Sequence, residues 1–188
     1  MRWEDIDQQA CSVARTLAVI GDRWTLLILR DAFLGTRRFE AFQRSLGISR
    51  HRLSDRLNKL VQQGVFNREA YQQRPQRFEY RLSRKGLALY PVMMTIAQWG
   101  NEWCDDGNGA PIEYLHRSCG QHTHAVLSCS ECGERLQPAE VSPQVGPGLA
   151  AAMESGRPLY GNSEQASDPA RQLPPLLQKS WFGAGSSD

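Results

Sequence analysis

The turn Gly47-Ile48-Ser49 constrains the fold more than any other stretch of this chain. Glycine tolerates the backbone of a tight turn, and serine is a favourable N-cap for a following helix. Apolar residues recur at helical spacing on both sides, so one helix is expected over residues 38–46 and another over residues 50–63. Two short helices joined by a tight glycine turn are typical of a helix-turn-helix.

The second of these helices has one apolar and one polar face. Leu53, Leu57 and Leu60 recur at i, i+4 and i+7, and we interpret them as core residues. The opposite face is polar and carries His51, Asp55, Asn58 and Gln62. The major groove of B-DNA admits one helix, and a helix that reads base edges must be apolar behind and hydrogen-bonding in front.

The residues after this helix predict a wing. Gly64 ends the helix, and apolar and polar side chains then alternate over residues 65–71 and 77–82, which predicts two strands joined by the polar loop 72–76. Three further helices are expected, over residues 12–20, 23–34 and 83–103, with Ser12 and Asp22 as caps of the first two. The predicted fold class is mainly α with a small β wing, a winged helix-turn-helix.

Positive charge is concentrated within this predicted fold. Residues 1–104 hold 17 Lys and Arg against 10 Asp and Glu, whereas residues 105–188 hold 5 against 10. Residues 37–85 carry 13 positive and 4 negative side chains, a net charge of +9. Such a field suits a polyanion, and nucleic acid is the commonest one in a cell. A solvated surface that keeps the protein soluble is the alternative reading of charge alone.

Arginines and polar residues around the turn are the candidate DNA-binding residues. The first turns of the helix over residues 50–63 are expected to contact base edges, and Asp55 either accepts from cytosine or orients Arg52 or Arg56. The arginines before that helix are placed for phosphates, and those of the wing for an adjacent minor groove. The set comprises Arg37, Arg38, Arg44, Ser49, Arg50, His51, Arg52, Ser54, Asp55, Asn58, Lys59, Arg74 and Arg77.

Residues 11–107 resemble the HxlR-type winged helix-turn-helix regulators. The resemblance rests on separated elements in a fixed order: Cys11, GDRWTLLIL, GTRRF, GISRHRLSDRL, EYRLSRKG and a closing Trp-Gly. It implies a bacterial transcription factor, usually dimeric, that binds operator DNA and responds to small molecules or oxidants. It also implies that the first and last helices form the dimer interface, which would account for the surplus of apolar side chains over residues 87–103. Packing of that surface beneath the cysteine-rich segment is the alternative.

Cys11 occupies the position of a cysteine through which some members of this family sense electrophiles or oxidants. A helix N-terminus lowers the pKa of a thiol and so favours the reactive thiolate. The alternative is a small buried residue at the dimer interface, which we favour because no resolving cysteine is nearby; Cys104 is only a distant candidate.

Three of the five cysteines cluster between residues 119 and 132 and predict a zinc site. His116-x-x-Cys119-Gly and Cys129-x-x-Cys132-Gly are half-sites of the same form, spaced so that both ligands of each can turn toward one ion. We expect a closed, structural Zn²⁺ site, with His122 or His124 as alternatives to His116. A small hairpin with free thiols is the competing interpretation.

Composition divides the chain into four parts. An N-terminal arm (residues 1–10) precedes the winged helix-turn-helix and dimerisation domain (11–107), and a zinc-ribbon-like module (111–141) precedes a low-complexity tail (142–188) that we expect to be mostly disordered. Within the tail, residues 174–182 are read as a short helix or a docking segment. The N-terminus has no signal-peptide pattern and residues 24–29 are too short an apolar run to cross a bilayer, so a cytoplasmic protein without a membrane partner is expected.

These observations favour a sequence-specific, DNA-binding transcriptional regulator. The alternative is a winged-helix module that binds another protein, although such modules are usually less basic on the face of the recognition helix. An enzyme is not expected, because the sequence shows no glycine-rich phosphate loop, no nucleophile with a visible base and no paired carboxylates at useful spacing.

Overall fold

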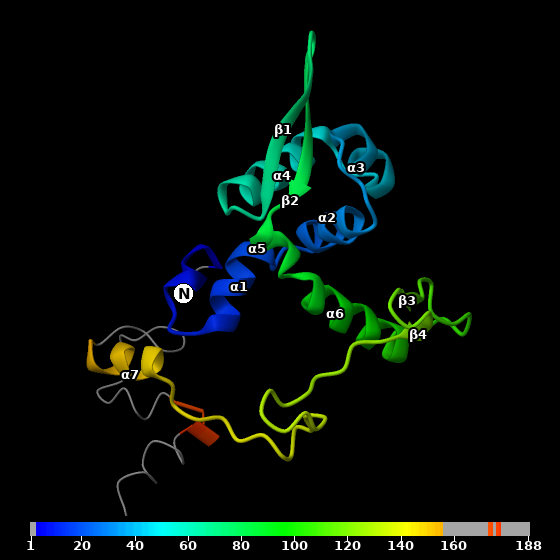
Figure 1. The fold of residues 1–188 in the computed structure, drawn as a ribbon. Helices are drawn as coiled ribbons and strands as arrows, with labels where there is room; N and C mark the ends of the chain where they lie inside the picture. Colours follow the sequence, from blue (N-terminus) through cyan, green and yellow to red (C-terminus); the bar gives the residue numbers. More distant parts are fainter. Residues whose placement is uncertain (1–2, 156–172, 175, 178–188) are drawn as a thin grey trace, which may run out of the picture. The chain divides into compact units, whose positions relative to one another are not determined.

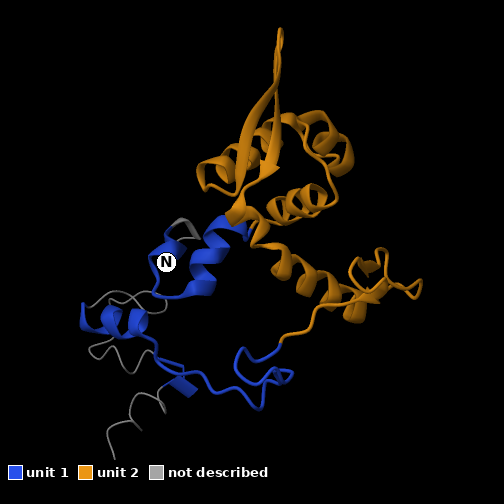
Figure 2. Cartoon of the chain, in the orientation of Figure 1, with its two compact units in different colours: residues 1–21, 128–188 blue, residues 22–127 orange. Residues whose placement is uncertain are grey.

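The structure is a computed structural model, and it describes residues 3–155, 173–174 and 176–177 of the 188-residue chain. It divides into two compact units, one made of residues 1–21 and 128–188 and the other of residues 22–127 (Figure 2). Each unit is described by itself. None of the helices over the described residues is long and apolar enough to cross a membrane.

The unit of residues 22–127 contains the predicted helix-turn-helix and wing (Figure 1). Its elements in chain order are α2 (Arg23–Phe33), α3 (Phe39–Leu46), α4 (Arg50–Gln62), β1 (Phe66–Gln73), β2 (Gln76–Leu82), α5 (Arg84–Leu87), α6 (Tyr90–Trp103), β3 (Tyr114–His116) and β4 (Gln121–Thr123). The strands form two separate antiparallel pairs, β1 with β2 and β3 with β4.

The core beneath the helix-turn-helix confirms the leucine stripe. Leu53, Leu57 and Leu60 of α4 are fully buried. The ring of Phe42 on α3 lies 6.4 Å from that of Phe66 on β1, centroid to centroid, so aromatic packing joins the helices to the wing. Burial of the whole stripe leaves only the polar face of α4 for solvent.

The turn has the predicted backbone. Gly47 ends α3 in the left-handed region, with φ of 59°. The hydroxyl of Ser49 caps α4 by accepting a hydrogen bond from the backbone N–H of Arg52 at 3.4 Å. A residue with a Cβ would be strained at the position of Gly47. A glycine at this position is therefore a specific sequence signal for the turn.

The wing is longer than predicted. β1 and β2 extend to Gln73 and Gln76, so that Arg74 and Pro75 alone form the turn. An irregularity in the register between Ala70 and Gln72 interrupts the pairing. At its base, the N–H of Tyr80 donates to the carbonyl of Arg37 at 2.7 Å, which fixes the wing against the segment that leads into α3.

The prediction of one continuous helix over residues 83–103 is wrong. The structure has α5 and α6, separated by a turn at Ala88 and Leu89, with Pro91 in the first turn of α6. Proline lacks the N–H that would bond to the preceding turn, and its ring disfavours helical backbone at the residue before it. Pro91 therefore starts a new helix more readily than it continues an old one.

The other unit contains η1 (Trp3–Gln8), α1 (Ser12–Ile20) and α7 (Pro147–Glu154). Cys11, not Ser12, is the N-cap of α1, and its side chain makes no capping hydrogen bond. Composition predicted no helix at α7, whose Ala152 packs in a small buried cluster with Leu173. Much of the predicted disordered tail, including most of residues 174–182, lies outside the described residues.

Candidate nucleic-acid interface

A groove of about 680 Å³ is lined by α4 and the wing, with Phe39 and Glu40 of α3 also in its lining. From α4 it is lined by Arg50, His51, Ser54 and Asn58, four of the predicted DNA-binding residues. The wing contributes Arg77, also predicted. The groove thus brings hydrogen-bonding side chains from the helix and a cation from the wing to one surface.

The other predicted residues lie outside this groove but remain available to solvent. Every member of the predicted set except the half-buried Ser54 is exposed. Those outside the groove are Arg37, Arg38, Arg44, Ser49, Arg52, Asp55, Lys59 and Arg74. An exposed, cationic surface around a polar helix face is what contacts to phosphates require.

Three arginines of this surface lie over aromatic rings. The guanidinium of Arg68 is 3.7 Å from the ring centroid of Phe78, within the wing. That of Arg38 is 4.5 Å from the ring of Tyr71. Arg50 lies 5.0 Å from the ring of Phe39. Such stacking holds a cation in a defined place while its N–H groups remain free to donate.

Arg68 and Tyr71 line the groove and were missed by the sequence reading. Both lie on β1, where strict alternation would place residues 68 and 71 on opposite faces. The irregularity between Ala70 and Gln72 interrupts that alternation, and it could not be predicted from the sequence pattern.

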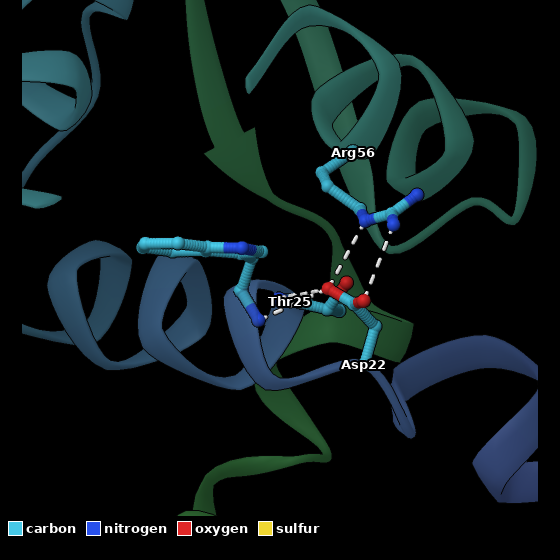
Figure 3. A network of polar contacts seen from close by, with 4 residues as sticks. Asp22, Thr25 and Arg56 are labelled. Atoms are coloured by element: carbon cyan, nitrogen blue, oxygen red, sulfur yellow. Dashed lines mark hydrogen bonds and ion pairs between the residues drawn. The ribbon is translucent and has the colours of Figure 1, made fainter. Parts of the chain in front are cut away.

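Arg56 points away from the polar face of α4 and joins α4 to the start of α2. Its guanidinium forms a two-pronged ion pair with Asp22, with Nε–Oδ1 and Nη2–Oδ2 distances of 3.0 and 3.2 Å (Figure 3). Asp22 also caps α2 as predicted, because its Oδ1 accepts from the N–H groups of Trp24 and Thr25 at 3.0 and 3.3 Å. One carboxylate therefore fixes α4 to the start of α2.

Partial burial raises the pKa of the Asp22 carboxyl. The hydrogen bond and the charge of Arg56, together with the N–H groups of Thr25 and Trp24, lower this pKa by more. The pKa of Asp22 therefore lies below its usual value. A carboxyl whose pKa falls on folding stabilises the fold at pH values above the unfolded-state pKa of about 3.9. That contribution is lost as the pH falls through the lower pKa of the folded state.

Replacing Asp22 with asparagine is expected to lower the free energy of unfolding at pH 7 by about 1 kcal/mol. Asparagine keeps the cap but loses the ion pair. The loss is modest because the paired groups are about one-third exposed. Urea unfolding at several pH values measures this. The difference from the wild type should shrink below about pH 4. Asp55→Asn, which removes a more exposed carboxylate of α4, is the matched control; a difference that persists unchanged into acid would contradict the assignment.

In the free protein Asp55 lies beside His51, and its alternative role of orienting Arg52 stays a prediction. Its Oδ2 lies 3.1 Å from Nδ1 of His51, one helical turn earlier, whereas Arg56 is held by Asp22. Both partners of the His51–Asp55 pair are exposed, and pairs at this spacing on an exposed helix are weak. The pair can therefore open when either side chain finds another partner.

The predicted metal ligands form two pairs in the structure. Nδ1 of His116 lies 3.3 Å from Sγ of Cys119. At the second pair, hydrogen bonds from the backbone N–H of Cys132 and then of Glu131, together with the thiol of Cys132, lower the pKa of Cys129. Over the described part of the chain, no three His, Cys, Asp or Glu side chains are gathered into a group able to hold a metal ion.

A polar helix face behind a tight turn, with a basic hairpin directly after it, defines a winged helix-turn-helix protein of the transcription-factor type. Comparison with known proteins agrees. The sequence model of a family described as HxlR-like helix-turn-helix matches residues 19–108.

Named relatives carry the same description. Rv3095 of Mycobacterium tuberculosis, an uncharacterized HTH-type transcriptional regulator, is 45% identical over 144 residues, which cover 77% of this chain and 91% of the relative. YdeP of Bacillus subtilis, with the same description, is 34% identical over 100 residues, covering 53% of this chain and 78% of YdeP.

Solved structures of candidate transcription factors are similar as well. PA1607 superposes with a TM-score of 0.64 at 37% identity, covering 72% of this chain and 94% of PA1607. PA1374 of Pseudomonas aeruginosa superposes with a TM-score of 0.52 at 34% identity, covering 73% of this chain and 93% of PA1374. The chain belongs to the HxlR-like helix-turn-helix family, whose members are transcriptional regulators and not enzymes.

Proposed function

We propose that this regulator binds duplex DNA sequence-specifically as a homodimer and that a small molecule or an oxidant changes its affinity. The observation that carries the proposal is the surface of α4: its leucines are buried, while Arg50, His51 and Asn58 are exposed toward a groove shared with the wing. In this arrangement α4 enters the major groove and the wing contacts the neighbouring backbone or minor groove.

A winged-helix module that binds another protein is the alternative function. Phosphate contacts release counterions from DNA, so the logarithm of the binding constant falls linearly with that of salt, with a slope of about −0.9 for each phosphate neutralised. Filter binding to random-sequence duplex at increasing salt separates the two. A steep loss of affinity supports the proposal, and no binding at low salt would favour the protein-binding module.

Two exposed arginines are expected to differ in what they contribute. Arg52→Ala should weaken binding to a selected operator by about 1–3 kcal/mol and relax base preference, because Arg52 lies in the first turns of α4. Arg74→Ala, at the wing turn, should weaken binding to all duplexes alike and reduce the slope of the salt dependence by about 1. Each variant is the control for the other. If Arg52→Ala, like Arg74→Ala, weakened binding to operator and to random DNA equally, Arg52 would not be a residue that contacts base edges.

The exposed face of α6 supports the dimer. Val92, Ile96, Trp99 and Trp103 recur at i, i+4, i+7 and i+11 and are all exposed, the two tryptophans at 62% and 68%. We call these four residues the α6 stripe. Solvated apolar stripes of this kind mark sites of association. On α1, Val13 and Leu17 are exposed as well, which fits the predicted use of the first helix.

The opposite face of α6 supports an effector site. Met94 and Gln98 line a cavity of about 190 Å³ whose other walls include Ile112 and Tyr114, next to β3 and β4. Within the described residues, Oε1 of Gln98 is buried without a hydrogen-bond partner. A small molecule with one donor group would satisfy that atom. Because one helix carries both the cavity and the α6 stripe, a ligand here would act on the dimer directly.

Cys11 offers a second route, through oxidation. It is half-buried at the N-cap of α1. Its sensing role stays a prediction beside the alternative of a small interface residue. Thermal-shift screening of small molecules against wild type and Gln98→Leu, and operator binding by Cys11→Ser before and after peroxide, separate these routes.

A further inference from the structure

The face of the wing that packs against the helices changes from apolar to cationic along its length. At its base it carries Phe66 and Tyr80, which are both buried. The contact between the rings of Phe66 and Phe42 shows that this face meets α3. Arg68 lies directly opposite Tyr80 in the register of the hairpin and therefore shares the same face. Beyond the buried base, this face thus supplies the exposed Arg68 to the groove that α4 lines.

Phe78 holds the side chain of Arg68 in place. In the register Phe78 lies opposite Ala70, so Phe78 and Arg68 are diagonal neighbours on one face of the hairpin. The guanidinium of Arg68 lies 3.7 Å from the centroid of the Phe78 ring. Stacking uses the flat face of a guanidinium and leaves the N–H groups at its edge free to donate. Arg68 is therefore positioned before a ligand arrives, which reduces the entropy that its side chain loses on binding.

The charge of the groove favours an anion. Its lining includes three arginines, Arg50, Arg68 and Arg77, and among the described lining residues Glu40 is the single carboxylate. Arg50 is also stacked, over the ring of Phe39. Cations held in fixed places within a groove are suited to an extended anion whose charges are regularly spaced, such as one strand of the DNA backbone.

Arg81 shows that the opposite face of the same hairpin neutralises its own charge. It lies opposite Asn67 in the register, on the face that does not carry Arg68. Its Nε lies 3.1 Å from Oε2 of Glu69, and its Nη2 lies 2.6 Å from Oε1 of Glu79. None of the ion pairs found over the described residues includes Arg68. The charge of Arg68 is therefore available for an anion from outside the chain.

We propose that Arg68 binds a backbone phosphate of the DNA inside the groove and so fixes how the duplex lies between α4 and the wing. The inference rests on the proposed DNA binding, to which it adds a residue outside the expected set. A guanidinium can donate two parallel N–H bonds to the oxygens of one phosphate, whereas a lysine acts as a point charge. Phosphate contacts fix the register and orientation of a protein on the duplex without reading its sequence. Arg68 is thus a positioning residue for the side chains of α4.

The experiment measures binding of the full-length protein to random-sequence duplex at several salt concentrations. Arg68→Ala should weaken binding about 10-fold or more at low salt and reduce the slope of the salt dependence by about 0.9, the value for one phosphate contact. Arg68→Lys keeps the charge but loses the flat guanidinium, so the slope should stay while affinity falls by a smaller factor.

Arg81→Ala is the matched control, because it removes the same charge from the opposite face of the same hairpin. It should leave both the affinity and the slope close to those of the wild type. The circular dichroism spectra of all three variants should match that of the wild type, since Arg68 and Arg81 are exposed side chains.

Neutral methylphosphonates, placed one at a time along a selected operator, identify the phosphate. At the phosphate that Arg68 binds, the substitution should weaken binding by the wild type about as much as Arg68→Ala does. It should not weaken binding by Arg68→Ala any further, because the interaction is already lost. Additive losses at every position of the operator would contradict the contact.

The salt series distinguishes failure of this inference from failure of the proposed function. A steep slope in the wild type that is unchanged in Arg68→Ala would overturn the role of Arg68 and leave DNA binding in place. Equal losses in Arg68→Ala and Arg81→Ala would overturn it as well, because that pattern reflects total charge and not a contact in the groove. A wild type that binds no duplex at low salt would overturn both.

Discussion

Replacing Leu57 with alanine is expected to lower the free energy of unfolding of the winged helix by about 2–5 kcal/mol. Leu57 is the middle residue of the leucine stripe and is fully buried, so the smaller side chain leaves a cavity between α4 and the elements beneath it. Domains of this size are stable by only about 5–15 kcal/mol, so the loss is a large part of the whole. Urea unfolding followed by circular dichroism measures the difference.

The same variant tests whether α4 depends on the core for its position. Gln62→Ala, an exposed change on the same helix, is the matched control and should stay within about 0.5 kcal/mol of the wild type. Operator binding by Leu57→Ala should fall in proportion to the unfolded fraction and recover on cooling. A loss of stability below about 0.5 kcal/mol would mean that Leu57 is not part of the core.

The local features of the fold could be predicted from the sequence. The cap at Asp22, the turn at Gly47 and the stripe of α4 each depend on residues within one or two turns of one another, and periodicity and capping chemistry describe such neighbours directly. The break before α6 was equally local. Pro91 signalled it, but the apolar periodicity on both sides masked the signal.

Partners far apart in the chain could not be found in this way. Arg56 pairs with Asp22 across 34 residues, and nothing in the spacing of either distinguishes Arg56 from the other arginines of α4. His51 was one of several neighbours that Asp55 could reach, and on an exposed helix the alternatives differ by only a few tenths of a kcal/mol. Arg68 became a groove residue only once the register of β1 against β2 was known.

The dimer is the part of the proposed function with the sharpest test. Trp99→Glu places a charge in the middle of the α6 stripe, where Trp99 is 62% exposed in the single chain. Buried tryptophans at interfaces commonly contribute 2 kcal/mol or more to association, and an unpaired charge at such a site adds the cost of removing it from water. We expect the wild type to be a dimer in light scattering after size exclusion and the variant to be a monomer at the same concentration.

Operator binding should follow the change of assembly. A dimer holds two α4 helices at a fixed separation, so its second half-site binds at a high effective concentration, which a monomer loses. Affinity for an operator with two half-sites should fall by about 100-fold or more, whereas affinity for a duplex with one half-site should hardly change. Glu102→Gln, an exposed change on α6 outside the stripe, should alter neither assembly nor binding.

The half-site duplex separates the two ways in which the variant can fail. A fall in affinity for both duplexes would mean that Trp99→Glu damages the winged helix itself, and the circular dichroism spectrum would then change with it. A variant that remains dimeric, or a wild type that is already monomeric, would show that the α6 stripe does not join two copies of the chain. Loss of binding to the operator with two half-sites, with binding to the single half-site retained, is expected only if α6 sets the spacing of two recognition helices.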